Sequence, residues 1–180
     1  MPTSKLVILD RDGVINFDSI QYIKSPAEWK PIPGSLEAIA RLNDHGYRVI
    51  VATNQSGIGR ELFDMDTLSA IHDKMVKALA QVGGKVDAIF FCPHSAEAGC
   101  ECRKPSPGMF QQIAERYGID LNGVPTVGDS LRDLQAGAAM GCRPYLVQTG
   151  KGVKTQHDPA LPEGTQIFAD LAAVVLELTA

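Results

Sequence analysis

Several features are missing from this sequence, and each absence narrows the range of functions. No apolar run approaches the length of a membrane-spanning helix, and the first residues contain no apolar core of a secretory signal. Lysine and arginine total 17 against 21 aspartate and glutamate, giving a net charge of -4. They are scattered, so no broad basic face for nucleic acid is expected. An apolar heptad is also missing, and we expect a cytoplasmic monomer without membrane or nucleic-acid partners.

What is present is the composition of an ordinary folded domain. Hydrophobic residues make up 44% and charged residues 21% of the 180 positions, with no internal repeat or low-complexity segment. A chain of this length can bury one substantial core, whereas two halves would each be marginal. The sequence therefore predicts a single domain over residues 1–180, with no large cap domain.

Short apolar segments alternate with amphipathic segments along the chain. The short segments are nearly all apolar, which is typical of strands buried on both faces of a parallel sheet. The amphipathic segments have helical spacing, and most end near a glycine that can cap a helix. The expected strands are 5–9, 48–52, 86–91, 124–127 and 144–147, and the expected helices are 35–45, 66–82, 107–117, 130–140 and one after Asp170. This predicts an α/β fold, a doubly wound and mainly parallel sheet with helices on both faces, which binds ligands at the carboxyl ends of its strands.

The first expected strand ends in two aspartates, Asp10 and Asp12, followed by Gly13. Two carboxylates at this spacing can share one Mg²⁺ while keeping separate chemical roles. By itself, such a pair is more often a turn or a generic metal loop.

Polar residues also mark three later positions. The segment from Thr53 to Ser56 ends the second strand, where a hydroxyl and backbone N–H groups can surround phosphate oxygens. Lys104 precedes a helix and offers a cation, while Asp129 leaves the fourth strand with Asp133 one helical turn further on. Each has an ordinary alternative, namely a capping turn, a solvated surface residue and an acidic helix start. Their order along the chain favours one functional site over independent coincidences.

These motifs resemble those of the haloacid dehalogenase (HAD) superfamily of phosphotransferases, over essentially the full length of the chain. The resemblance implies that Asp10 attacks phosphorus and forms an aspartyl-phosphate, with Asp12 as general acid and base. It implies a Mg²⁺ ion held by the carboxylates of Asp10 and Asp129 and by the backbone carbonyl of Asp12. Lys104 would help to relieve the repulsion between nucleophile and phosphate.

The resemblance also assigns supporting roles. Thr53 would act with the catalytic residues, and together with Asn54 it would hold the oxygens of the transferring phosphoryl group. Ser130 and Asp133 would lie behind the residues that contact phosphate and metal, where Asp133 orients Lys104 or metal-bound water.

Three of the four cysteines join a histidine in one loop, and this set suits a tetrahedral structural zinc. The four residues are Cys92, His94, Cys100 and Cys102. Reduced thiols or a disulfide are the alternatives, although a cytosolic chain disfavours disulfides. Because four protein ligands leave no position for substrate, the zinc would only shape the loop, residues 92–104, and through it the position of Lys104. We expect zinc removal to lower both activity and stability.

The acidic motif and the zinc loop together narrow the resemblance to one branch of the superfamily. That branch contains heptose bisphosphate phosphatases and histidinol-phosphate phosphatases. The single-domain length and the loop from Asn16 to Tyr22 favour a heptose 1,7-bisphosphate, with removal of its 7-phosphate. The product would then serve the synthesis of ADP-heptose for lipopolysaccharide core. Histidinol phosphate is the alternative substrate, and a catalytically silent zinc-bearing binding module is a third possibility, against which the intact catalytic residues argue.

Specificity must come from loops if there is no large cap domain. These are residues 13–33 and 56–61 and the zinc loop. Arg103 and, less firmly, Arg60 offer cations for a second phosphate. The family often has glycine after the arginine of the second loop, whereas this chain has Glu61, which leaves the contacts of Arg60 open. The expected substrate-binding residues are Asp18, Tyr22, Thr53, Asn54, Gln55, Ser56, Arg60, Arg103 and Lys104.

Overall fold

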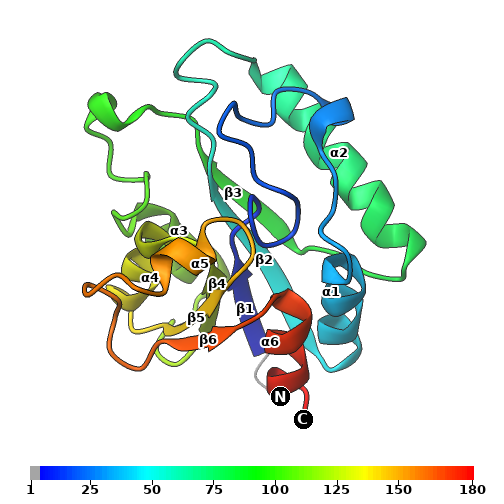
Figure 1. Cartoon of the computed structure of the whole chain (residues 1–180), viewed down its shortest axis with the longest axis vertical. Helices are drawn as coiled ribbons and strands as arrows, with labels where there is room; N and C mark the ends of the chain where they lie inside the picture. Colours follow the sequence, from blue (N-terminus) through cyan, green and yellow to red (C-terminus); the bar gives the residue numbers. More distant parts are fainter. Residues whose placement is uncertain (1–4) are drawn as a thin grey trace.

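The computed structural model describes residues 5–180, in which six parallel strands form one sheet (Figure 1). The strands are β1 (Lys5–Leu9), β2 (Tyr47–Asn54), β3 (Ala88–Cys92), β4 (Pro125–Gly128), β5 (Arg143–Val147) and β6 (Gln166–Phe168). The helices are α1 (Ser35–Asp44), α2 (Met65–Gln81), α3 (Gly108–Tyr117), α4 (Leu131–Ala138), α5 (Gly152–Thr155) and α6 (Leu171–Leu178), with 3-10 turns η1 (Pro26–Glu28) and η2 (Ala96–Ala98). Residues 1–4, where we expected no secretory leader, lie outside the described residues.

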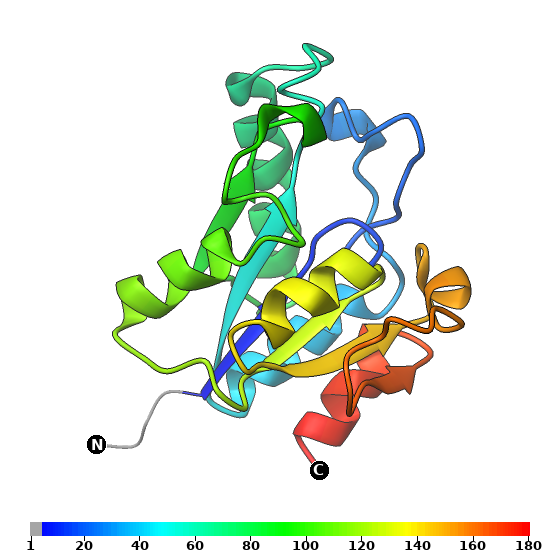
Figure 2. The same ribbon diagram turned by 90° about the vertical axis from the view of Figure 1, so that its left-hand side faces the viewer.

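Helices cover both faces of the sheet, as Figures 1 and 2 show. Val7 and Leu9 of β1 belong to a buried cluster with side chains of α1, α2 and α6. Their neighbours Leu6 and Ile8 belong to a second cluster with side chains of α3 and α4. Successive side chains of a strand point to opposite faces, so a nearly continuous apolar strand is needed to fill both cores. The predicted doubly wound fold is confirmed.

All five expected strands and all five expected helices are present, with ends that differ by at most two residues. Besides the two 3-10 turns, one strand and one helix were not expected. The edge strand β6 is only three residues long and mostly exposed, so it lacks the apolar run of the inner strands. The four-residue helix α5 is too short for any helical periodicity to be recognised. None of the helices in the range 5–180 is long and apolar enough to cross a membrane.

The strand order places the ends of β1 and β4 side by side. The order is β3-β2-β1-β4-β5-β6. Strands β2 and β3 therefore lie on one side of β1, and β4, β5 and β6 lie on its other side. A crevice forms at such a switch point, beyond the carboxyl ends of the strands. The backbone N–H of Asp10, directly after β1, donates to the carbonyl of Val127 in β4 at 3.0 Å. This topology brings Asp10 and Asp129 together although 119 residues separate them.

Candidate active site

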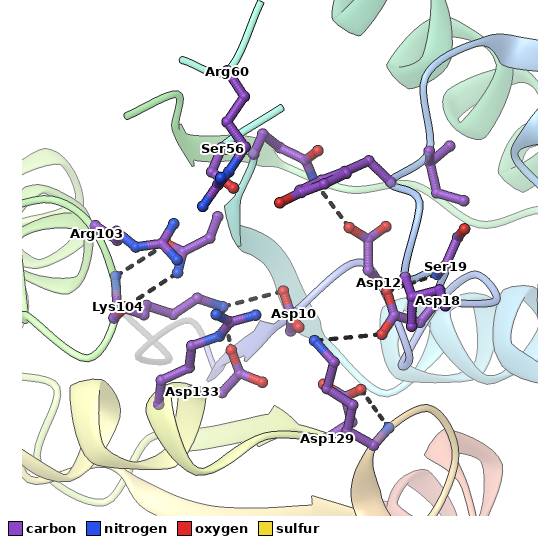
Figure 3. Close-up of a pocket in the computed structure, with 17 residues that line it drawn as sticks. Asp10, Asp12, Asp18, Ser19, Ser56, Arg60, Arg103, Lys104, Asp129 and Asp133 are labelled. Carbon is purple, nitrogen blue, oxygen red and sulfur yellow. Dashed lines mark hydrogen bonds and ion pairs between the residues drawn. The ribbon is translucent and has the colours of Figure 1, made fainter. Parts of the chain in front are cut away.

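A cavity of about 380 Å³ opens at this switch point (Figure 3). In this view Arg60 and Arg103 approach Asp10 from one side, while Asp18 and Ser19 lie on the other. The lining includes residues that the sequence analysis did not select: Ser19, Ile20, Ile23, Arg132 and Lys151. The expected site residues that line it are Asp10, Asp12, Asp18, Tyr22, Asn54, Gln55, Ser56, Arg60, Arg103, Lys104, Asp129 and Asp133.

Lys104 joins two carboxylates at the floor of the cavity. Its Nζ lies 3.1 Å from Oδ1 of Asp10, forms an ion pair with Asp133 and donates to the carbonyl of Ala52 at 2.8 Å. The Lys104 side chain is only 2% exposed. Burial acts to lower the pKa of Lys104, but Asp10 and Asp133 outweigh it and raise that pKa, so the ammonium group stays charged.

Three carboxylates share this floor, and their charges exceed what one lysine can balance. Oxygens of Asp10, Asp129 and Asp133 lie within 4.8 Å of one another. Burial, followed by the charge of Asp133, raises the pKa of Asp10 to about 7, and burial with the charges of Asp133 and Asp10 raises the pKa of Asp129 to about 8. A divalent cation would favour the ionised forms of both groups, and carboxylate oxygens are ligands that suit Mg²⁺.

Asp133 is less available as a metal ligand than its two neighbours. Besides the ion pair with Lys104, its Oδ2 accepts from the hydroxyl of Ser130 at 2.8 Å and from the backbone N–H of Ser130 at 3.2 Å. This is a capping box at the start of α4. The structure therefore places Asp133 and Ser130 behind Lys104, where they fix its position.

Two glycines let the backbone pass close to the Asp129 carboxylate. A Cβ atom on Gly13, which has φ +83°, or on Gly150, which has φ +58°, would overlap the Asp129 carboxylate. The backbone N–H of Lys151 donates to Oδ2 of Asp129 at 2.9 Å. The carboxylate is thus held between two loops that no larger residue could form at these positions.

Asp12 has one heavily occupied oxygen and one that is nearly free. Oδ1 accepts from Nε and Nη2 of Arg11 at 3.0 and 2.8 Å and from Nδ2 of Asn16 at 2.9 Å. Among the residues that the structure describes, Oδ2 accepts only from Nε2 of Gln55, at 3.1 Å. Burial acts to raise the pKa of Asp12, but Arg11 and these hydrogen bonds outweigh it and lower the pKa.

Some residues at the end of β2 line the cavity, and others support the residues that line it. The side-chain amide of Asn54 donates to the carbonyl of Lys104 at 3.1 Å and accepts from its N–H at 3.0 Å. Thr53 is buried, is not among the residues that line the cavity in the described part of the chain, and accepts from Gln55 Nε2 at 2.9 Å. Gln55 therefore lies over the hydroxyl that the resemblance assigned to the phosphoryl group.

Two residues in the loops near the cavity adopt left-handed backbone conformations that favour glycine. Tyr22 has φ 67° and Glu61 has φ 61°. The value at Glu61 gives a physical reason for the glycine that the family often has after the arginine of the second loop. Asp18 of the first loop lies 3.6 Å from Nζ of Lys151, an ion pair that joins this loop to the C-terminal part of the site.

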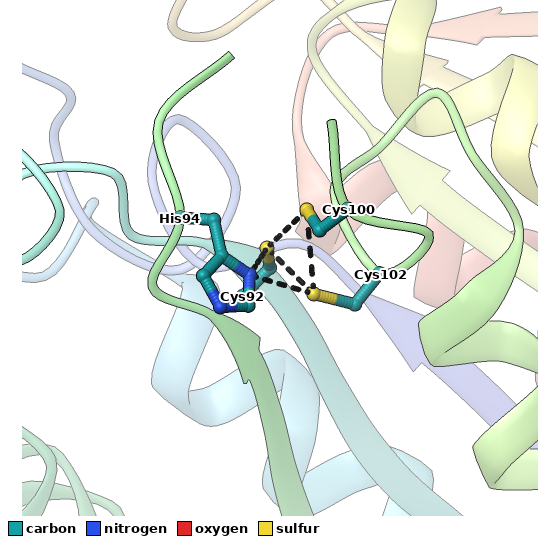
Figure 4. Close-up of side chains that lie close together, drawn as sticks. All are labelled: Cys92, His94, Cys100 and Cys102. Atoms are coloured by element: carbon teal, nitrogen blue, oxygen red, sulfur yellow. Dashed lines mark hydrogen bonds between the residues drawn. The ribbon is translucent and has the colours of Figure 1, made fainter. Parts of the chain in front are cut away.

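The four expected zinc ligands meet in one cluster (Figure 4). Five of the distances between their ligand atoms range from 2.8 to 3.7 Å. The edge of a tetrahedral zinc-thiolate site is about 3.8 Å for a metal-sulfur bond of about 2.3 Å, so most of these distances are close to it. All four cysteines of the chain are free thiols, and Cys142 lies apart from the cluster, buried against the second core. The set fits a structural zinc ion.

The comparisons with known proteins point in one direction. Residues 5–136 match the family described as polynucleotide kinase 3 phosphatase, and residues 101–174 match the HAD-hydrolase-like family. A D-glycero-beta-D-manno-heptose-1,7-bisphosphate 7-phosphatase of Bordetella bronchiseptica is 63% identical over 174 residues, which is 97% of each chain. The protein of that name from Pseudomonas aeruginosa is 57% identical, covering 96% of this chain and 97% of its own. A crystal structure of the D,D-heptose 1,7-bisphosphate phosphatase from B. bronchiseptica with magnesium and phosphate is 63% identical, has a TM-score of 0.95 and covers 97% of each chain.

Proposed function

The chain belongs to the D-glycero-beta-D-manno-heptose-1,7-bisphosphate 7-phosphatase family of HAD-like hydrolases, and we propose that it removes the 7-phosphate of this sugar through an aspartyl-phosphate on Asp10. The observation that carries the proposal is the position of Asp10. Its carboxylate lines the cavity at the switch point of the sheet, 3.1 Å from the Lys104 ammonium group.

The reaction has two steps, and Asp10 carries the phosphoryl group between them. In the first, a carboxylate oxygen of Asp10 bonds to the phosphorus of the 7-phosphate while the bond from phosphorus to the sugar oxygen breaks. Asp12 donates a proton to that departing oxygen. In the second, water attacks the aspartyl-phosphate and gives a proton back to Asp12, which releases inorganic phosphate and restores both carboxyl groups.

Relief of charge repulsion is the main demand on this site. The carboxylates of Asp10 and Asp129 and the backbone carbonyl of Asp12 would hold Mg²⁺, which when bound would offset the negative charge of nucleophile and phosphate. The described residues fit this ion, since carboxylate oxygens of Asp10 and Asp129 lie within 4.8 Å of one another and Gly13 lets the loop after β1 pass close to the Asp129 carboxylate. Lys104 adds a fixed positive charge, and Asp133 with Asn54 keeps it in place.

Asp12 is suited to move a proton because one of its oxygens remains accessible. Within residues 5–180, Oδ2 has a single donor, Gln55, which a substrate oxygen can displace. Asp12 is ionised in the free protein, the state needed to accept a proton from water. An arriving phosphate adds negative charge beside it and so favours uptake of the proton that the first step consumes.

Specificity for a bisphosphate is supported by the cations around the cavity. Arg103 and Arg60 line it together with Arg132 and Lys151, beyond the lysine used for the reacting phosphate. Guanidinium groups can bind phosphate through two hydrogen bonds each. Asp18, Tyr22 and Ser56 offer polar groups to sugar hydroxyls. The β anomer is proposed because the relatives are named for it, and the place in lipopolysaccharide-core synthesis stays a prediction.

Zinc is proposed as a structural ion of the loop formed by residues 92–104. Cys92, His94, Cys100 and Cys102 would fill its four positions, which leaves none for substrate. Its effect would be to hold the chain that leads from Cys102 into Arg103 and Lys104.

Phosphate release tests the proposal directly. Purified protein with Mg²⁺ is given D-glycero-beta-D-manno-heptose 1,7-bisphosphate, the α anomer and histidinol phosphate in parallel. We expect the highest kcat/KM for the β-heptose bisphosphate and no turnover by Asp10→Asn. A preference for histidinol phosphate would assign the other activity of this branch, and no release from any substrate would favour a silent binding module.

A further inference from the structure

Asp12 is held from behind by two buried side chains that the reaction does not use. We propose that Arg11 and His72 are positioning residues, which fix the Asp12 carboxyl group so that Oδ2 faces the leaving oxygen of the substrate. The inference rests on the proposed role of Asp12 as general acid.

All three guanidinium nitrogens of Arg11 take part in this arrangement. Its side chain is completely buried, and its Nε and Nη2 both donate to Oδ1 of Asp12. The remaining terminal nitrogen, Nη1, lies 3.1 Å from Nε2 of His72. A buried guanidinium donor without an acceptor is strongly unfavourable, so loss of the His72 contact would leave Arg11 free to turn or to recruit water.

The chemistry of Arg11 determines the state of His72. Arginine can only donate hydrogen bonds, so Nε2 of His72 must be the acceptor and the ring must be neutral, with its proton on Nδ1. Burial, followed by the nearby Arg11 charge, lowers the pKa of His72 to about 4, which agrees with this assignment. The ring comes from the middle of α2, is 8% exposed and lies beside Phe91 with ring centroids 6.4 Å apart. His72 thus connects helix α2 to Arg11 in the loop that follows β1.

As a consequence, the two carboxylate oxygens of Asp12 differ in how many hydrogen bonds they accept. Two donors from Arg11 and one from Asn16 occupy Oδ1, which leaves no room there for an added proton. Oδ2 keeps a free direction toward the cavity. A general acid needs its proton within hydrogen-bond reach of the leaving oxygen, and small misplacements of such a group lower rates strongly.

The test uses two substrates that differ in their need for an acid. A sugar oxygen requires a proton to leave, whereas p-nitrophenolate leaves as a stable anion. We therefore compare kcat/KM for heptose bisphosphate and for p-nitrophenyl phosphate in each variant. His72→Leu removes the acceptor, His72→Gln restores an acceptor oxygen at similar reach, and Arg11→Lys keeps the charge but loses the two-nitrogen contact. Ile71→Val, a buried change on the same helix, is the matched control, and Asp12→Asn sets the pattern for loss of the acid.

The expected pattern is selective. His72→Leu and Arg11→Lys should lower kcat for heptose bisphosphate by roughly tenfold or more, but by less than the 10²–10⁴ that full loss of a general acid costs, with little change in KM. The kcat/KM for p-nitrophenyl phosphate should fall less than about twofold, because it reports only the first step and not the later proton transfer from water to Asp12. This result would also show that the variants are folded, and His72→Gln should restore most of the rate lost on heptose bisphosphate. Equal losses on both substrates, with a selective Asp12→Asn, would overturn the positioning role while leaving the proposed function intact. An unselective Asp12→Asn would overturn the positioning role together with the proposed acid role of Asp12, because no acid would then exist to be positioned.

Discussion

The side-chain amide of Asn54 makes two hydrogen bonds to the backbone of Lys104, one to its carbonyl at 3.1 Å and one from its N–H at 3.0 Å. These bonds tie the end of β2 to the last residue of the zinc loop. Lys104 is therefore fixed at its backbone by Asn54 and at its ammonium group by Asp133. The position of Lys104 thus depends on contacts from the end of β2 and from helix α4.

Asn54→Asp should damage catalysis by loosening Lys104. The substitution replaces a donor with a second acceptor, which faces the Lys104 carbonyl without a hydrogen bond and adds negative charge near the phosphate. We expect kcat to fall at least tenfold, because a misplaced charge stabilises the transition state poorly. Steady-state kinetics would measure it, and the exposed Asn122→Asp serves as control. Wild-type kcat in Asn54→Asp would show that this contact does not hold Lys104.

Gly13→Ala should disable the proposed magnesium site. An added Cβ overlaps the Asp129 carboxylate, and the residue must also keep φ +83°. The matched control is Gly46→Ala, which has φ +82° but open space around it. Both variants should lose about 1–2 kcal/mol of stability to backbone strain, but only Gly13→Ala should need far more Mg²⁺ for half-maximal activity. Equal Mg²⁺ dependence in the two variants would contradict the predicted location of the ion.

Loss of the zinc cluster should reduce stability and activity together. Cys102→Ser removes one of four ligands, and we expect zinc content to fall and the free energy of unfolding to drop by more than about 2 kcal/mol. Activity should fall as well, since Lys104 follows the last ligand after one residue. Elemental analysis and thermal unfolding measure both effects, with Cys142→Ala as the control that keeps its zinc. A Cys102→Ser protein with unchanged metal would rule out the ligand set.

His72 should make stability depend on pH in a defined window. Its pKa is lowered from 6.5 to about 4 in the folded state, so between these values the unfolded chain binds a proton that the folded chain does not. The contribution of neutral His72 to stability is therefore fully present above pH 6.5 and is lost as the pH falls toward 4, by up to about 3 kcal/mol. Urea unfolding at pH 7.5 and 5 should show a decrease that is about 2 kcal/mol smaller in His72→Gln. Identical pH dependence in the two proteins would contradict a neutral, buried His72.

Much of the fold and of the candidate site could be predicted from the sequence. Strands buried on both faces are nearly all apolar, and in a parallel sheet their carboxyl ends share one edge, so Asp10, Lys104 and Asp129 could be grouped without coordinates. The zinc ligands lie close in sequence, and their residue types alone indicate a metal. The structure places all of these as expected, while their catalytic roles remain to be tested.

The parts that were not predicted depend on contacts between distant segments. Arg11 reads as an ordinary charged residue of the acidic motif, and nothing local shows that it meets His72, 61 positions later. Lys151 precedes a helix too short to recognise, yet its N–H holds Asp129 and its side chain reaches Asp18. The position of Gln55 over Thr53 likewise follows from side-chain packing, which a motif does not encode.

The central claim is that phosphorus becomes covalently attached to Asp10. Protein quenched during turnover of heptose bisphosphate and treated with borohydride should carry homoserine in place of Asp10, since acyl phosphates are reduced while free carboxylates are not. Peptide mass spectrometry would locate the change, and Asp10→Asn should show none. Homoserine at another aspartate, or unmodified protein throughout turnover, would contradict the account.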